Sequence, residues 1–293
     1  MPEVPSLLNI GELSKPATVL NDKISEAVGA IFKPLQIERV ARAEAKAAII
    51  KSEAETQITE LQRRALNRWI GEEAHKQANM ESIISKSLPL LSATSKPQEM
   101  ENDWVTNFFD KCRLISDKEM QTLWAKLLSG EANSPGAYSK RTVNLVAELD
   151  KQAAVWLSNL CRFAAMHGDQ PIPLIYDLDA AVYAEGGIFF GMLTHLDSIG
   201  LVKFEALSGF SLNSTFQPLE LRYQGTSFLI ESKLVASHPR VHIGKVLFTQ
   251  SGMELARICE PKAIPSFVDF FLDKWVSDGL VVSSPYPYRG AAI

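Results

Sequence analysis

The fold of this chain depends on residues 33–91, which read KPLQIERVARAEAKAAIIKSEAETQITELQRRALNRWIGEEAHKQANMESIISKSLPLL. This stretch has no proline between Pro34 and Pro89, and its one glycine is Gly71. It is rich in Ala, Glu, Lys, Arg, Gln and Leu, the residues that favour helices most strongly. The composition therefore predicts a single helix over residues 33–91, far longer than the average globular helix of about eleven residues.

Apolar side chains recur along this predicted helix in steps of three, four and four residues. The resulting period of about 3.67 residues per turn favours a nearly straight or slightly right-handed bundle over a heptad coiled coil. We call this row of side chains the seam; it comprises Ala47, Ile50, Ala54, Ile58, Leu61, Ala65 and Trp69. A compact domain of this size cannot cover so long a seam. We therefore expect copies of the chain to associate through it as a homo-oligomer.

Composition and charge exclude several classes of protein. The chain has 293 residues, 46% of them hydrophobic, and can bury the cores of two or three domains. Its net charge of −4 is spread evenly, so electrostatic binding of nucleic acid is not favoured. Cys112, Cys161 and Cys259 lie far apart among apolar residues, which indicates reduced core thiols. No signal peptide or membrane span is recognisable, so we expect a cytoplasmic protein.

Residues 17–32 predict a short amphipathic helix that ends or kinks at Lys33 and Pro34. Such a helix would either lie on a membrane surface or pack against protein. Membrane-surface helices usually carry a polar face rich in Lys and Arg, whereas this polar face contains both signs of charge. Packing against the long helix or a neighbouring subunit is therefore favoured over a membrane anchor.

The sequence predicts a mostly α fold with a small α+β part. Residues 1–96 hold the short amphipathic helix and the long oligomerisation helix. Residues 97–169 form a helical bundle, in which Asp150 caps the last helix. Residues 170–293 change to β-rich runs in the order helix, short strand, hairpin, strand, helix. That order resembles a winged-helix module, and a C-terminal helix and a tail follow it.

The chain contains none of the common catalytic or metal-binding motifs. His238 and His242 are four residues apart, but they lie in a β-rich stretch and are interpreted as surface histidines. Asp177 and Asp179 are interpreted as turn and cap residues at the entry to a helix, rather than as a metal pair. The sequence thus indicates no catalytic residue, no cofactor site and no metal ligand.

Winged-helix modules often place one helix in the major groove of DNA. The helix expected here, around residues 188–196, contains no Lys or Arg, and the following strands carry only scattered basic residues. A protein-interaction or structural role is therefore favoured over the reading of DNA.

Several segments together resemble a bacterial family that is defined only as a domain of unknown function, number 2806. The segments are residues 20–29 (LNDKISEAVG), 32–34 (FKP), 41–47 (ARAEAKA), 77–83 (QANMESI), 123–128 (LWAKLL), 134–136 (SPG), 139–142 (SKRT) and 247–255 (LFTQSGMEL). The resemblance implies a bacterial, prophage or mobile-element setting, and it supplies no catalytic residue. That setting permits a role in phage defence.

We therefore expect a non-enzymatic scaffold or sensor that self-associates through the long helix and presents its C-terminal module to a protein partner. One alternative is a DNA-binding regulator that uses the winged-helix-like module. The other is an enzyme whose site is assembled between subunits. Basic residues clustered on one surface would favour the regulator, and a cleft with converging carboxylates would favour the enzyme.

Overall fold

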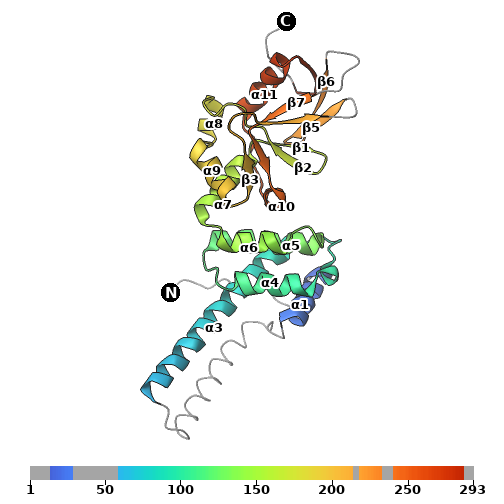
Figure 1. The fold of residues 1–293 in the computed structure, drawn as a ribbon. Helices are drawn as coiled ribbons and strands as arrows, with labels where there is room; N and C mark the ends of the chain where they lie inside the picture. The colour runs from blue at the N-terminus through green and yellow to red at the C-terminus, as the bar shows by residue number, and fades with distance from the viewer. Residues whose placement is uncertain (1–13, 29–58, 214–217, 233–239, 287–293) are drawn as a thin grey trace, which may run out of the picture. The chain divides into compact units, whose positions relative to one another are not determined.

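The computed structural model describes residues 14–28, 59–213, 218–232 and 240–286 (Figure 1). These residues form an α-rich protein with a smaller β part, which agrees with the predicted fold class at this level. The chain divides into two compact units, residues 1–147 and 148–293.

The first unit is helical. Its described elements are α1 (Lys15–Val28), α3 (Glu60–Ser87), η2 (Leu88–Leu90), η3 (Pro97–Glu99), α4 (Asn102–Cys112), α5 (Lys118–Asn133) and α6 (Lys140–Glu148). α1 packs against α4, and α3 packs against α5. Because α3 packs on α5, the long helix and the start of the predicted bundle form one unit, without a division after residue 96.

Aromatic side chains of α4 and α5 form the core of the first unit. The ring of Phe108 lies 5.2 Å from that of Trp104 and 5.1 Å from that of Trp124, and all three side chains are buried. The Nε1–H group of Trp104 donates a hydrogen bond to the carbonyl oxygen of Tyr138, at 2.7 Å. The aromatic cluster therefore also holds the loop that precedes α6.

α3 begins at Glu60 and not near residue 33. Thr59 has an extended backbone (φ −64°, ψ 154°), and its hydroxyl oxygen accepts a hydrogen bond from the backbone N–H of Gln62. In return, the Gln62 side chain accepts one from the backbone N–H of Thr59. This reciprocal cap starts a helix, so the prediction of one uninterrupted helix over residues 33–91 is wrong at Thr59. Strong helix formers flank Thr59 on both sides, and for this reason helix propensity alone did not predict the cap.

The short amphipathic helix of the sequence corresponds to α1. Its apolar face is buried at Ala17, Leu20 and Ile24. Two hydrogen bonds connect its far end to α4. The Thr106 hydroxyl donates to the carbonyl oxygen of Ala27, and the side-chain amide of Asn102 donates to the carboxylate of Glu26. The helix thus packs within its own unit.

The second unit combines helices with antiparallel sheets. Its elements are α7 (Lys151–Cys161), β1 (Ala164–His167), β2 (Gln170–Pro173), α8 (Ala181–Glu185), α9 (Phe190–Ser198), β3 (Val202–Phe204), β4 (Phe210–Asn213), β5 (Leu219–Tyr223), β6 (Thr226–Ser232), β7 (Arg240–Gly244), β8 (Val246–Phe248), α10 (Gln250–Ala256), α11 (Pro265–Ser277) and β9 (Leu280–Ser283). The largest sheet has the strand order β2-β1-β5-β6-β9, and β3 pairs with β8 and β4 with β7.

The last helix of the predicted bundle is shorter than expected. α7 begins after Asp150, whose carboxylate accepts a hydrogen bond from the Ala153 N–H at 2.7 Å, and it ends at Cys161. β1 follows directly and pairs with β2 across a turn at Gly168, which has a φ of +57°. The boundary predicted after residue 169 would therefore cut this hairpin, whereas the observed units divide before α7.

α11 supplies the core of the second unit. Phe267, Phe271 and Trp275 recur every four residues on its buried face, a spacing typical of an amphipathic helix. The ring of Phe271 lies 5.2 Å from that of Phe228 on β6. The Nε1–H group of Trp275 donates a hydrogen bond to the hydroxyl oxygen of Tyr176, at 2.8 Å.

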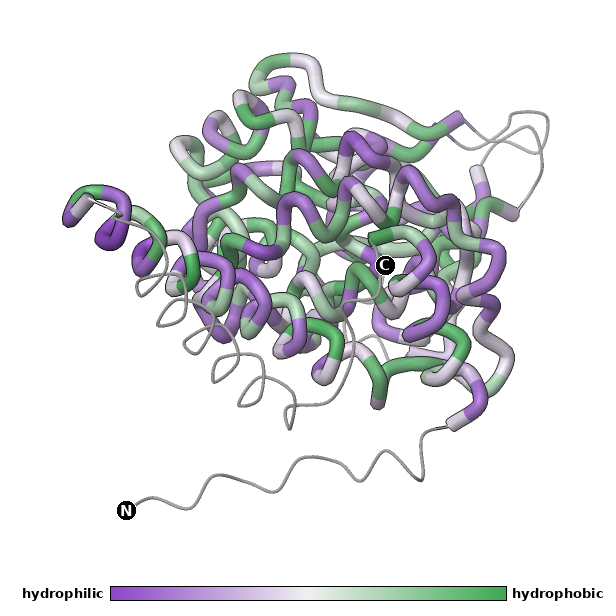
Figure 2. The backbone as a smooth tube through the Cα atoms, turned by 90° about the horizontal axis from the view of Figure 1, so that it is seen from below, coloured by the Kyte–Doolittle hydropathy of each residue, from purple (hydrophilic) through white to green (hydrophobic). Residues whose placement is uncertain are grey.

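Hydrophobic and hydrophilic residues are interspersed along the helices (Figure 2). Within the described ranges, no helix combines the length and the apolar character that crossing a membrane requires.

The first prediction concerns Glu131, whose buried carboxylate accepts hydrogen bonds from the backbone N–H groups of Gly136 (2.7 Å) and Tyr138 (3.0 Å). Replacing Glu131 with Ala leaves both donors without this acceptor, and we expect the free energy of unfolding to fall by about 2–4 kcal/mol. Chemical denaturation followed by tryptophan fluorescence measures the change. As a control, Glu72→Ala removes only an exposed pair with Arg68 and should cost less than about 0.5 kcal/mol. Equal losses in the two variants would contradict this role of Glu131.

The second prediction concerns alkaline pH. Burial raises the pKa values of Tyr176, Tyr183 and Tyr223 above the ordinary value. Above about pH 10 the unfolded chain releases these phenolic protons while the folded protein keeps them, so stability is complete below that pH and falls above it. We expect the phenolate absorbance of these side chains to appear together with loss of the circular dichroism signal. Complete tyrosine ionisation near pH 10 in a protein that keeps its native spectrum would contradict this.

Candidate functional site

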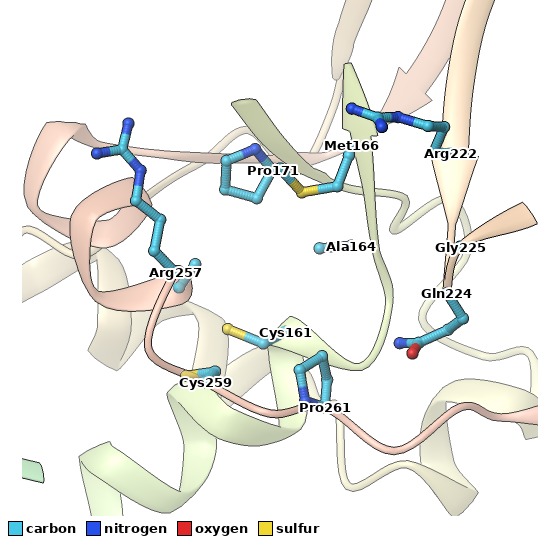
Figure 3. A pocket seen from close by; sticks show the side chains of 11 residues that line it. Cys161, Ala164, Met166, Pro171, Arg222, Gln224, Gly225, Arg257, Cys259 and Pro261 are labelled. Atoms are coloured by element: carbon cyan, nitrogen blue, oxygen red, sulfur yellow. The ribbon is translucent and has the colours of Figure 1, made fainter. Parts of the chain in front are cut away.

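The second unit contains a cavity of about 440 Å³ (Figure 3). It lies between the end of α7, the β1–β2 hairpin, the end of β5 and the segment after α10. Its apolar lining is Ala164, Met166, Pro171, Gly225, Ala256 and Pro261, and its polar lining is Cys161, Arg222, Gln224, Arg257 and Cys259.

Tyr223 lies between Arg222 and Gln224, which line the cavity, and its side chain joins two segments of the second unit. Its hydroxyl group donates a hydrogen bond to the carbonyl oxygen of Arg162 at 2.8 Å and accepts one from the backbone N–H of Ile264 at 3.3 Å. A single side chain on β5 therefore joins the end of α7 to the segment that leads into α11. Because burial raises the pKa of Tyr223, the hydroxyl keeps the proton that it donates at neutral pH.

Gln224 has an unusual backbone conformation beside the cavity. Gln224 and Gly225 form the two-residue turn between β5 and β6, with φ values of +48° and +82°. Positive φ at both positions defines a type I′ turn, which strongly prefers Asn, Asp or Gly at its first position. Gln224 is the one non-glycine residue with positive φ in the described part of the chain. Strained positions of this kind gather at functional sites, and the Gln224 side chain lines the cavity.

The rim of the cavity is positively charged. Arg222 donates a hydrogen bond from Nη2 to the carbonyl oxygen of Gly168, at 3.0 Å. Neither Arg222 nor Arg257 forms an ion pair with an acidic residue in the described ranges. Guanidinium groups favour anionic partners, so an anionic group is the kind of ligand that the rim would attract.

Two thiol groups meet on one wall of the cavity. The Cys161 thiol is buried and hydrogen-bonded to Cys259, and the Cys259 thiol in turn donates to the carbonyl oxygen of Leu255, with the atoms 3.6 Å apart. The hydrogen bond to Cys259, followed by burial, raises the pKa of Cys161. Neither cysteine forms a disulfide, as predicted, and Cys161 is buried in the core whereas Cys259 is only half-buried. Cys112 is buried in α4, in the first unit.

The seam is only partly within the described residues. Ala47, Ile50, Ala54 and Ile58 lie outside them. Leu61, Ala65 and Trp69 occupy one face of α3 at steps of four residues, and Leu61 and Trp69 are 69% and 57% exposed. We call these three residues the α3 stripe. No partner chain is present, so its part in an assembly stays a prediction.

The other residues singled out in the sequence have ordinary surroundings. The Asp177 carboxylate accepts a hydrogen bond from the Asp179 N–H at 3.1 Å, which confirms the turn interpretation. His242 on β7 is half-buried, with its ring 5.9 Å from that of Tyr176, so the interpretation as a surface histidine is wrong for His242. His238 lies outside the described residues. Among the residues that the structure describes, no three His, Cys, Asp or Glu side chains are grouped to hold a metal ion.

Comparison with known families gives one match, over residues 63–271, to the family described as "Protein of unknown function (DUF2806)". The chain belongs to the DUF2806 family. The match covers more than half of the chain, includes every residue that lines the cavity, and confirms the resemblance noted from the sequence. Neither the curated proteins nor the solved structures gave a match to the chain.

Sequence reasoning missed the cavity of this DUF2806 protein. Its lining comes from segments that are distant along the chain and meet only in the folded unit. The Gln224-Gly225 pair was the strongest available indication, because a glycine between two β-rich runs marks a tight turn.

The third prediction tests the strain at Gln224. Replacing Gln224 with Asn places a favoured residue in the type I′ turn, and we expect a gain in the free energy of unfolding of roughly 0.3–1 kcal/mol. Replacing it with Val should cost about 1 kcal/mol or more, because β-branched residues resist positive φ. Denaturation midpoints compare the three proteins. A Val variant as stable as the Asn variant would show that the turn is not strained.

Proposed function

We propose that this chain is a non-enzymatic scaffold or sensor that self-associates through α3 and presents its second unit to a protein partner. The exposed apolar α3 stripe is the observation that carries this proposal.

Two parts of α3 differ in burial. Its last turns bury Met80, Ile83 and Ile84 against the helical unit. Its first turns carry the α3 stripe, with Leu61 and Trp69 largely exposed to solvent. Full burial of a large apolar side chain contributes roughly 1.5–3 kcal/mol, and a symmetric oligomer repeats this gain in every subunit. Association through the α3 stripe would therefore bury Leu61 and Trp69 in every subunit and stabilise the assembly.

The second unit carries an apolar surface at α9. Phe189 and Phe190 are 47% and 57% exposed at its start, and Phe190 lies edge-on to Phe204 on β3, with the ring centres 5.4 Å apart. Aromatic side chains are enriched at protein interfaces. α9 contains no Lys or Arg, which favours a protein partner over DNA. The DNA-binding alternative therefore has less support than a protein-interaction role.

The winged-helix-like arrangement belongs to the same proposal. α9 is followed by β3, which pairs with β8, and α10 follows β8. The insertion between β3 and β8 is larger than a single wing, because β5 and β6 join the five-stranded sheet and β4 pairs with β7. We propose that this enlarged wing and α9 form the interaction module.

The proposal also includes the genetic context and the cellular location expected from the sequence. A bacterial prophage or mobile-element context, a cytoplasmic location and a role in phage defence would suit a self-associating sensor. The enzyme alternative required a cleft with converging carboxylates. No carboxylate belongs to the described lining of the cavity in the second unit, whereas Glu99, Glu101 and Glu131 line a cavity of about 420 Å³ in the first unit. The Glu131 carboxylate accepts hydrogen bonds from two backbone N–H groups of the loop before α6, which favours a structural role for it.

The fourth prediction tests the α3 stripe. The double variant Leu61→Glu with Trp69→Glu places charges on the stripe of every subunit, and we expect it to dissociate the assembly into monomers. Light scattering after size exclusion measures the mass, and circular dichroism verifies that the helices persist. The control variant Glu72→Ala loses an exposed side chain on the same helix and should keep the native mass. A double variant with the mass of the unaltered oligomer would exclude the stripe as the interface.

A further inference from the structure

We propose that Cys161 and Cys259 form a redox-active dithiol that closes into a disulfide when the protein meets a hydroperoxide. Neither thiol takes part in the self-association proposed above, so each hypothesis can fail without the other.

The fold holds the two sulfur atoms side by side. Cys161 ends α7 and Cys259 follows α10, and Figure 3 shows both sulfur atoms on the same wall of the cavity. The segment after α10 is tied to the end of α7 by the Nε–H group of Arg162, which donates to the carbonyl oxygen of Lys262 at 3.4 Å. The bridging hydroxyl group of Tyr223 strengthens the same connection. A disulfide therefore needs little movement of the backbone.

The two thiols differ in how accessible they are from the cavity, and this difference gives them different roles in the reaction. Cys259 is half-buried and lines a cavity of about 440 Å³, whereas Cys161 is buried behind it. The Cys161 thiol keeps its proton, because its hydrogen bond to Cys259 and its burial both raise its pKa. Cys259 is therefore the thiol that a hydroperoxide in the cavity reaches first.

The reaction balances in two steps. The Cys259 thiolate attacks one oxygen of hydrogen peroxide, an S–O bond forms as the O–O bond breaks, and the leaving hydroxide takes up a proton to become water. The sulfur of Cys161 then attacks the sulfenic acid at Cys259. The S–S bond forms, the S–O bond breaks, and the oxygen leaves as water with the Cys161 proton. In total, two thiols lose two electrons and two protons, and the peroxide is reduced to two water molecules.

The experiment uses the full chain treated with a small molar excess of hydrogen peroxide, which catalase then removes. Unfolding in the presence of an alkylating reagent counts the free thiols by mass spectrometry. The untreated chain has three cysteines, and we expect one free thiol after oxidation, at Cys112. Peptide mapping should find the peptides of Cys161 and Cys259 joined, and dithiothreitol should restore all three thiols.

Matched variants separate this pair from other oxidations. Cys112→Ser should still form the disulfide and retain no free thiol. Cys259→Ser should form no intramolecular disulfide and keep both remaining thiols. The inference is wrong if the unaltered chain keeps three free thiols, if Cys259 is oxidised to sulfinic acid while Cys161 stays free, or if the disulfide includes Cys112 or a second chain. The unaltered chain alone decides among these outcomes, so a variant that fails to fold does not affect the result.

Discussion

The transfer of large apolar side chains out of water is favourable. In the first turns of α3, however, Leu61 and Trp69 are exposed to solvent. The last turns of the same helix satisfy this constraint within the chain, because they are buried against α5. One helix therefore serves both the interior of its unit and an exposed apolar face. Self-association would bury the exposed apolar face and leave the packing of the last turns of α3 unchanged. This difference in burial along α3 is the physical basis of the proposed scaffold.

The second unit depends on a different constraint, the joining of segments that are far apart in sequence. The hydroxyl group of Tyr223 connects the end of α7 with the segment before α11, and the aromatic face of α11 covers the sheet from which Tyr223 extends. Cys161, next to Arg162 in the chain, and Cys259, five residues before Ile264, both line the cavity. The proposed redox-active dithiol would thus depend on the segments that Tyr223 joins.

Features set by local physical chemistry could be predicted from the sequence. The amphipathic α1, the Asp150 cap and the buried face of α11 follow from periodicity and capping alone. The cap at Thr59 was missed because strong helix formers flank it, and β1 was missed because Ala164, Ala165 and Met166 continue a helix-favouring run after α7. The cavity and the cysteine pair could not be predicted, since tertiary packing joins their residues across long stretches of chain.

The central claim, self-association, is tested most directly by the mass of the unaltered full chain in solution. Sedimentation equilibrium over a range of micromolar concentrations gives this mass without reference to shape. We predict a multiple of the chain mass of 32.4 kDa that persists on dilution through the low micromolar range. A mass of 32.4 kDa at every concentration would contradict the account, and the exposed α3 stripe would then have no partner in a second copy of the chain.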